Sequence, residues 1–357
     1  MKISEEKIDK ATKARAVNSV KQQVASQISL RNRVKFYKKR VQEVKYHLSK
    51  KPIEWGKFQN EFNVEIDAIF RNIMDFEKGN FDSKNKTDKL KLLFINKFRE
   101  FFVKGTYIEW SLRKPFGYPG DYRIIDDIYR NHPKTTGYDR LFDNYYQMLA
   151  ISAAVRNRKE DFKRRIIDFA NSKQGNPVRI MNLACGSARD IKEILSSENL
   201  LNSNLVFDCY DHDMRAIKYA KSLLGDCPNV HFFKQNALRM AATRNSESKI
   251  NEKYDFIYSM GLFDYLNHKV SMRLVCNLKK LLKTEGVLAV SSVRDKHSNP
   301  SVHFMEWVGD WNLVYRSDNE FQKIFTDGGF SYDKLSIQYE QQGIMLYIFA
   351  TKKLEKP

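Results

Sequence analysis

A turn of small residues, Asn182–Ala188 (NLACGSA), follows an apolar run of strand length and precedes a stretch with helical character. Small side chains let a ligand approach the backbone closely, and the first turn of the next helix offers free N–H groups to it. Asp211 ends the following apolar run. An acid there, roughly twenty residues past a glycine turn, is placed to hold the two hydroxyls of a ribose. These residues predict a ribose-bearing ligand.

The elements that must hold this turn alternate between strand-like and helix-like stretches. The expected strands are Val178–Leu183, Leu205–Asp213, Val230–Lys234, Tyr254–Met260 and Gly286–Val293, with a helix at Met214–Leu224. Strands that alternate with helices at this spacing indicate an α/β fold with a parallel sheet. Ligands of such sheets bind across the carboxyl ends of the strands.

Residues 178–350 resemble class I S-adenosylmethionine-dependent methyltransferases. In that comparison the turn Asn182–Ala188 is the glycine-rich first motif, Asp211 is the ribose-binding acid, and Asn236 with Ala237 is the loop beside the adenine. Ser331–Glu340 and Gly343–Lys352 resemble the antiparallel hairpin that distinguishes this sheet from a dehydrogenase sheet. The resemblance implies a Rossmann-like seven-stranded α/β sheet, preceded by a helical N-terminal domain, and S-adenosyl-L-methionine as cofactor. The cofactor-binding residues that it implies are Ala184, Gly186, Ser187, Asp211, His212, Asn236, Ala237 and Met260, with Tyr118 and Asp121 from the segment described next.

The segment Leu112–Tyr122 (LRKPFGYPGDY) combines two glycines and two prolines with charged and aromatic residues. It cannot continue a helix, so its side chains are set in one defined turn. It resembles the KPxGYPGDY signature of a bacterial methyltransferase subgroup associated with methyl esters of 3-hydroxy fatty acids used as extracellular signals. By that resemblance Tyr118 and Asp121 close over the methionine end of the cofactor, and Arg113 or Lys114 faces a carboxylate.

Residues after the fourth and fifth strands are expected to face the transferred methyl group, because this fold presents its loops there. A carboxylate acceptor needs cations that position it, whereas a hydroxyl or ammonium acceptor needs a base. Arg294 with His303 or Arg316 could clamp a carboxylate, and Trp307 and Trp311 could floor the pocket. The predicted catalytic residues are Tyr118, Asp264 and His303, and the predicted substrate-binding residues are Arg294, His303, Trp307 and Arg316. The Pro-Pro-aromatic signature of amino-group methyltransferases is absent after the fourth strand, which disfavours methylation of DNA or RNA bases.

The 357-residue chain is 42% apolar and 13% aromatic, which is enough for a large core and two structural units. We expect a basic helical extension at 1–51, a helical lid at 52–170 and the cofactor-binding domain at 171–357. No apolar run approaches membrane-spanning length, which predicts a soluble, cytoplasmic protein without a transmembrane segment. The four cysteines have neither paired nor metal-like spacing, so no metal site is expected.

The net charge of +19 is concentrated at the start of the chain, where residues 1–51 carry 15 Lys and Arg against 4 Asp and Glu. Val34, Tyr37, Val41, Val44 and Leu48 recur in this region at helical spacing and predict an apolar seam. The charge suits a solvated helix face or an anionic partner, either RNA or a membrane surface. The N-terminal helices could also form a homodimer.

Three functional hypotheses remain open at this point. The first is a methyltransferase of a small-molecule acceptor, most concretely the carboxylate of a 3-hydroxy fatty acid or its carrier-bound form. The second is a methyltransferase of RNA or protein that docks through the basic helices. The third is a cofactor-binding module without catalysis, because Asn182 stands where the family commonly has an acid and Ala184 and Ala188 replace glycines. An amide still hydrogen-bonds and alanine is small, so we expect cofactor binding to be preserved.

Overall fold

The computed structural model describes residues 32–80, 83–198, 200, 204–243, 250 and 252–353. The chain divides into two compact units. The first comprises Met1–Pro119, Pro133–Leu149 and Pro300–Trp311, and the second comprises Gly120–His132, Ala150–Asn299 and Asn312–Pro357. This division differs from the predicted boundaries at residues 51 and 170. Within the described ranges, no helix has the length and apolar character needed to cross a membrane.

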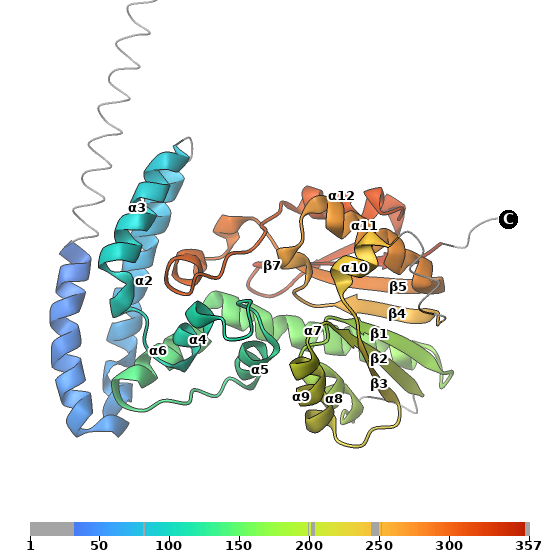
Figure 1. Ribbon diagram of the computed structural model, residues 1–357, viewed down its shortest axis with the longest axis horizontal. Helices are drawn as coiled ribbons and strands as arrows, with labels where there is room; N and C mark the ends of the chain where they lie inside the picture. Colours follow the sequence, from blue (N-terminus) through green and yellow to red (C-terminus); the bar gives the residue numbers. More distant parts are fainter. Residues whose placement is uncertain are drawn as a thin grey trace, which may run out of the picture. The chain divides into compact units, whose positions relative to one another are not determined.

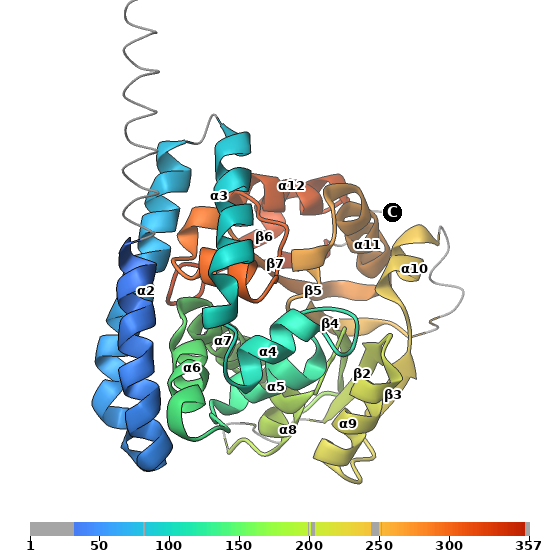
Figure 2. The same cartoon turned by 60° about the vertical axis from the view of Figure 1, so that its left-hand side comes forward.

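The first unit is built of helices around an aromatic core. Its elements are a helix over residues 32–50, η1 (Pro52–Trp55), α2 (Gly56–Gly79), α3 (Lys84–Lys97), η2 (Arg99–Phe101), α4 (Thr106–Arg113), α6 (Gly137–Met148) and the π-helical turn η6 (Phe304–Val308). The helix over 32–50, drawn in blue, runs beside α2 (Figures 1 and 2). Tyr37 of that helix stacks on Phe102 with ring centroids 5.1 Å apart and contacts Phe62 of α2.

The apolar seam predicted for the N-terminal region is confirmed, and it faces the core of its own unit. Val34, Tyr37, Val44 and Leu48 are buried, and Val41 is partly buried. Most of the basic extension, residues 1–31, lies outside the described residues. The structure therefore explains the seam as packing within one chain.

The apolar pattern between α2 and the GYPGDY segment predicts one helix from Thr87 to Trp110, and this prediction is wrong. The helical conformation is interrupted between η2 and α4, where Gly105 has a φ of +76°. A Cβ atom at Gly105 would lie 2.6 Å from Oδ1 of Asp143, a buried carboxylate that accepts hydrogen bonds from the backbone N–H groups of Thr106, Lys134 and Thr135. Glycine is required there because both the dihedral angle and the space exclude a side chain.

The second unit contains the predicted seven-stranded sheet. Its strands are β1 (Val178–Leu183), β2 (Leu205–Asp211), β3 (Val230–Lys234), β4 (Tyr254–Ser259), β5 (Leu282–Val293), β6 (Leu335–Tyr339) and β7 (Met345–Thr351). They lie in the order β3-β2-β1-β4-β5-β7-β6, with β7 antiparallel to both neighbours and the other pairs parallel. The order reverses between β1 and β4, which makes the carboxyl ends of these strands the expected ligand site.

Helices cover both faces of this sheet, as Figure 1 shows. α10 (Ala237–Ala242), α11 (His268–Leu281) and α12 (Asp318–Asp327) lie on one face, and α7 (Ala150–Ser172), α8 (Arg189–Leu195) and α9 (Met214–Leu224) lie on the other. α5 (Tyr122–Arg130) packs beside α7. The predicted domain boundary at residue 170 therefore separates two helices, α5 and α7, from the sheet unit to which they belong.

Candidate active site

The small-residue turn after β1 takes an unusual backbone path. Ala184, Gly186 and Ala188 all have left-handed dihedral angles, with φ values of 59°, 55° and 51°. Glycine adopts this region freely, whereas alanine does so at a cost of about 1 kcal/mol or more. The two alanines therefore keep the conformation expected of the glycines that they replace. Strain of this kind concentrates at ligand sites, which supports a binding role for the turn.

We expect Ala188→Gly to leave the protein at least as stable as the wild type, with a gain of up to about 1 kcal/mol in the free energy of unfolding. The substitution relieves the left-handed strain, and the greater flexibility of the unfolded glycine offsets part of that gain. Urea unfolding checks this. Ala216→Gly, at a buried position inside α9, is the matched control and should lose about 1 kcal/mol or more. A loss at Ala188 as large as in the control would contradict the strain argument.

Asp211 lies at the end of β2 and braces this turn. Its Oδ2 accepts the backbone N–H of Gly186 at 2.9 Å, and its Oδ1 accepts that of Asp213 at 2.9 Å. His212 Nδ1 lies 3.4 Å from Oδ1, and this hydrogen bond raises the pKa of His212. A carboxylate oxygen can accept more than one hydrogen bond, so Asp211 retains capacity for two ribose hydroxyls. The turn and the acid fit the adenosyl group that the family resemblance implies.

The end of β3 lies beside Asp211. Gln235 N donates to the backbone oxygen of Asp211 at 2.8 Å. Asn236 caps α10, because its Oδ1 accepts the N–H groups of Leu238 and Arg239 at 2.8 and 3.3 Å. Ala237 is the first residue of that helix. The predicted residues at the ends of β1, β2 and β3 are thus brought to one edge of the sheet, and their cofactor contacts stay a prediction.

A buried polar network joins the strands on either side of the reversal point. Asn182 of β1 donates from Nδ2 to the Tyr258 hydroxyl of β4 at 2.8 Å, and that hydroxyl donates to Asp190 Oδ2 of α8 at 2.5 Å. All three residues are buried. Asn182, which stands in β1 where the family commonly has an acid, is therefore linked through Tyr258 to a carboxylate from α8. This network could not be predicted from the sequence, because Asp190 resembles an ordinary acid in the first turn of a helix.

The contribution of Asp190 to stability should fall as the pH rises from about 4 to about 6. Burial raises the pKa of Asp190 to about 6, which outweighs the hydrogen bond from Tyr258. In this window the native state binds more protons than the unfolded chain, whose aspartates titrate near about 4. We expect Asp190→Asn to flatten this part of the pH profile of the free energy of unfolding. Identical profiles for the variant and the wild type would contradict the assignment.

The GYPGDY segment contributes α5 to the sheet unit. Asp121 is fully buried, and its Oδ1 accepts the N–H groups of Arg123 and Ile124 at 2.8 and 3.1 Å as the N-cap of α5. Tyr122 lies against the first motif, since a Cβ atom at Gly186 would lie 3.8 Å from the Tyr122 Cβ. The role predicted for Asp121 at the methionine end of the cofactor stays a prediction. Tyr118 is half-buried and belongs to the first unit.

Asp126 of α5 fastens this helix to the two helices that follow β1 and β2. The Arg189 guanidinium donates to both of its oxygens at 2.6 and 2.8 Å, and the Tyr219 hydroxyl donates to Oδ2 at 2.7 Å. Burial raises the pKa of Asp126, but the hydrogen bonds from Arg189 and Tyr219 outweigh it and hold the pKa below its usual value. Neither Asp126 nor Arg189 belongs to the residues predicted from the sequence.

The loop after β4 contains Asp264, a predicted catalytic residue, which is buried. Its Oδ1 accepts the N–H of Val293 at the end of β5 at 2.8 Å, and its backbone oxygen accepts the N–H of Val314 at 2.8 Å. Arg158 Nη1 of α7 lies 3.8 Å from Oδ2. Burial raises the pKa of Asp264, and the charge of Arg158 opposes that rise. The carboxylate joins the ends of β4 and β5, and its catalytic role stays a prediction.

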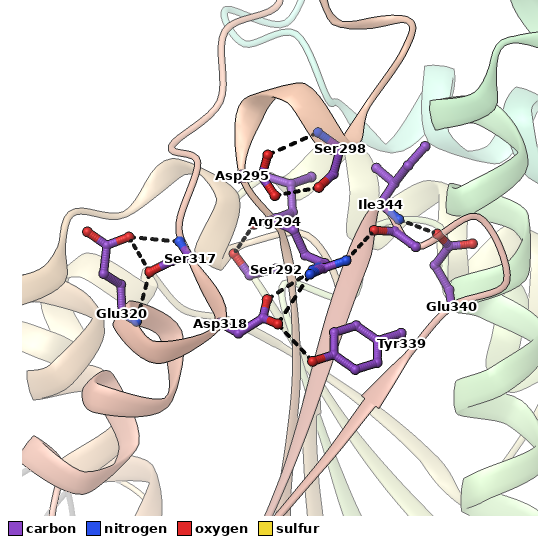
Figure 3. Close-up of polar contacts among 12 residues, drawn as sticks. Ser292, Arg294, Asp295, Ser298, Ser317, Asp318, Glu320, Tyr339, Glu340 and Ile344 are labelled. Atoms are coloured by element: carbon purple, nitrogen blue, oxygen red, sulfur yellow. Dashed lines mark hydrogen bonds and ion pairs between the residues drawn. The ribbon is translucent and has the colours of Figure 1, made fainter.

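The two predicted substrate arginines of the second unit hold loops together. The Arg294 guanidinium pairs with the Asp318 carboxylate at 2.9 and 3.2 Å and donates to the Gly343 oxygen at 3.0 Å, and Tyr339 also donates to Asp318 (Figure 3). Arg316 donates to the backbone oxygens of Phe263 and Leu266 and to Ser292 Oγ. These contacts give both arginines structural roles, and the carboxylate clamp stays a prediction.

His303 and Trp307 belong to the first unit, whereas Arg294 and Arg316 belong to the second. His303 Nε2 lies 2.8 Å from Glu77 Oε2, and the buried imidazole packs edge-on against Trp307. Trp307 in turn contacts Phe94 of α3. Their described contacts are those of core residues. Substrate binding by the four residues, and the role of His303 as a base, stay predictions.

Comparisons with known proteins agree with this geometry. Residues 165–322 match the model of a protein family described as tellurite resistance protein TehB. Malonyl-[acyl-carrier protein] O-methyltransferase 1 of Ilyobacter polytropus is 29% identical over 157 residues, which cover 44% of this chain and 49% of that protein. The chain thus spans about half the length of this curated relative.

A solved structure shares the fold. A possible exported protein from Bordetella parapertussis superimposes with a TM-score of 0.56 at 16% identity, over 74% of this chain and 96% of the other. The magnesium protoporphyrin IX methyltransferase of Synechocystis PCC 6803 gives a TM-score of 0.40 at 11% identity, over 57% of this chain and 84% of the other. The strand order and the turn braced by Asp211 agree with the Rossmann-like sheet of methyltransferases, and the family match spans β1 to β5 of this sheet.

Proposed function

We propose that this protein binds S-adenosyl-L-methionine and transfers its methyl group to an oxygen of a small-molecule acceptor. The observation that carries the proposal is the brace between Asp211 and Gly186 N at the reversal point of the sheet. This brace positions a carboxylate and a left-handed turn side by side, where a ribose and the chain attached to it bind. The match to an O-methyltransferase over 44% of this chain supports the chemistry.

The acceptor that we propose is a carboxylate, most concretely that of a 3-hydroxy fatty acid or its carrier-bound form. The motif LRKPFGYPGDY supports this choice, because it resembles the signature of the subgroup associated with such esters. The curated relative is named as an O-methyltransferase of malonyl-[acyl-carrier protein], and a malonyl group attached at one end keeps a carboxyl group at the other.

The chain's own residues have a limited task in this reaction. The cofactor supplies an electrophilic methyl group on a sulfonium. An ionised carboxylate already has a free lone pair, so the protein must orient it in line and exclude water rather than remove a proton. Asp211 and the turn hold the adenosyl end, and α5, fastened through Asp126, covers the turn at Tyr122. The loops after β4 and β5, joined by Asp264, form the edge that faces the acceptor.

Isothermal titration with S-adenosylmethionine and S-adenosylhomocysteine tests the cofactor, and we expect micromolar binding of both. A screen of 3-hydroxy fatty acids by mass spectrometry then tests the acceptor, with the methyl ester as the expected product. A folded protein that binds neither cofactor form contradicts the proposed function. Binding without any ester product would keep the cofactor and overturn the acceptor.

A further inference from the structure

Arg158, in the third turn of α7, is a buried cation at the carboxyl edge of the sheet. Its exposed fraction is 3%. A Cβ atom at Gly261, two residues after β4, would lie 3.2 and 3.4 Å from its two terminal nitrogens, and Gly261 has a φ of +90°. The backbone of the loop after β4 therefore packs directly on the guanidinium. Open α/β sheets bind their ligands at this edge.

The polar partners of Arg158 do not use all of its donors. A guanidinium carries five N–H donors. The Tyr129 side chain interacts with it, and Asp264 Oδ2 lies at 3.8 Å from Nη1, which is too long for a direct hydrogen bond. Nε has no hydrogen-bond partner among the described residues. Buried cations are normally paired and hydrogen-bonded, because leaving them otherwise is costly.

The carboxylate nearest to Arg158 also has other partners. Asp264 interacts electrostatically with Arg158 and with Arg316, and both arginines are buried. Arg316 interacts with Glu320 as well. The Asp264 Oδ1 is already engaged by the N–H of Val293. Asp264 therefore does not pair with Arg158 alone, and a ligand carboxylate would pair with this guanidinium more closely than Asp264 does.

We propose that Arg158 binds a carboxylate of a ligand at the loop after β4. The inference rests on the proposed function, in which two molecules carry a carboxylate: the amino-acid end of the cofactor and an acid acceptor. The planar guanidinium fork suits a carboxylate, because it donates two parallel hydrogen bonds. The buried position excludes water, which strengthens such a pair.

Wild-type protein gives the first test, by calorimetry with matched ligand pairs. S-adenosylhomocysteine is compared with its decarboxylated analogue, and 3-hydroxydodecanoate is compared with the matching diol in the presence of S-adenosylhomocysteine. We expect the carboxylate-bearing member of one pair to bind at least about tenfold more tightly, the scale of a hydrogen bond to a charged group. Equal affinities within both pairs would overturn the role of Arg158. Failure to bind either adenosyl ligand would instead overturn the proposed function.

Variants give the second test. Arg158→Met removes the charge, and Arg158→Lys keeps the charge without the fork and serves if the first variant does not fold. We expect the affinity for the carboxylate ligand to fall at least about tenfold in the Met variant, with less than a twofold change for the ligand that lacks the carboxylate. A loss in the first ligand pair assigns Arg158 to the cofactor, and a loss in the second assigns it to the acceptor.

The matched control is Arg164→Met, an exposed arginine on the same helix that pairs with Asp161. It should bind every ligand as the wild type does. A folded Arg158 variant that also binds every ligand as the wild type does would show that the arginine serves only the core.

Discussion

Asp211→Ala should weaken the affinity for S-adenosylhomocysteine by about 1.5–3 kcal/mol, the scale of lost hydrogen bonds to a charged group. The carboxylate would otherwise accept the ribose hydroxyls, and it also holds the N–H of Gly186 in the first motif. Isothermal titration at neutral pH measures the difference. An affinity within twofold of the wild type would remove Asp211 from the binding site.

Asp213→Ala is the matched control for this experiment. Asp213 is also buried and lies two residues away, but its carboxylate caps α9 by accepting the N–H of Arg215 and pairs with the Arg215 guanidinium. We expect this variant to lose about 0.5–2 kcal/mol of stability, as for other helix caps, and to keep its affinity. Equal losses of affinity in both variants would indicate that the whole segment had shifted, rather than that one ligand contact was removed.

Asp126→Ala should lower the free energy of unfolding by about 3–5 kcal/mol, because it leaves the Arg189 guanidinium and the Tyr219 hydroxyl without their shared acceptor. Urea unfolding measures this loss. Asp327→Ala removes an exposed carboxylate that pairs with Lys323 and His268, and it should cost no more than about 1 kcal/mol. A loss at Asp126 as small as that of the control would mean that α5 is not held by this contact.

Acid should reduce the difference between wild type and Asp126→Ala. The folded pKa of Asp126 lies below its usual value, so the carboxylate stabilises the native state above the unfolded pKa, near about 4. This contribution is lost as the pH falls through the folded pKa. We therefore expect the two unfolding curves to converge at low pH, whereas a constant gap would contradict the charge argument.

Much of the sheet was predictable because its signals are local. The apolar runs placed β1 and β3 at their observed bounds, and the helix Met214–Leu224 was also placed correctly. The predicted second strand ran two residues too far, and the fifth began four residues too late. Strand ends depend on pairing with neighbours, which the sequence of one strand does not contain.

The sequence by itself determined which residues stand at the carboxyl ends of the strands, because strand period and chain order fix them. Asp211 and the first motif were found in this way. Tertiary structure decided what each side chain contacts. Arg294 pairs with Asp318, and His303 lies within hydrogen-bond distance of Glu77, and neither partner could be predicted from the sequence. Asp190, Asp126 and Arg158 could not be recognised from the sequence, because the partners Tyr258, Arg189 and Asp264 lie 63 to 106 residues away and only folding brings those side chains within hydrogen-bond or charge range.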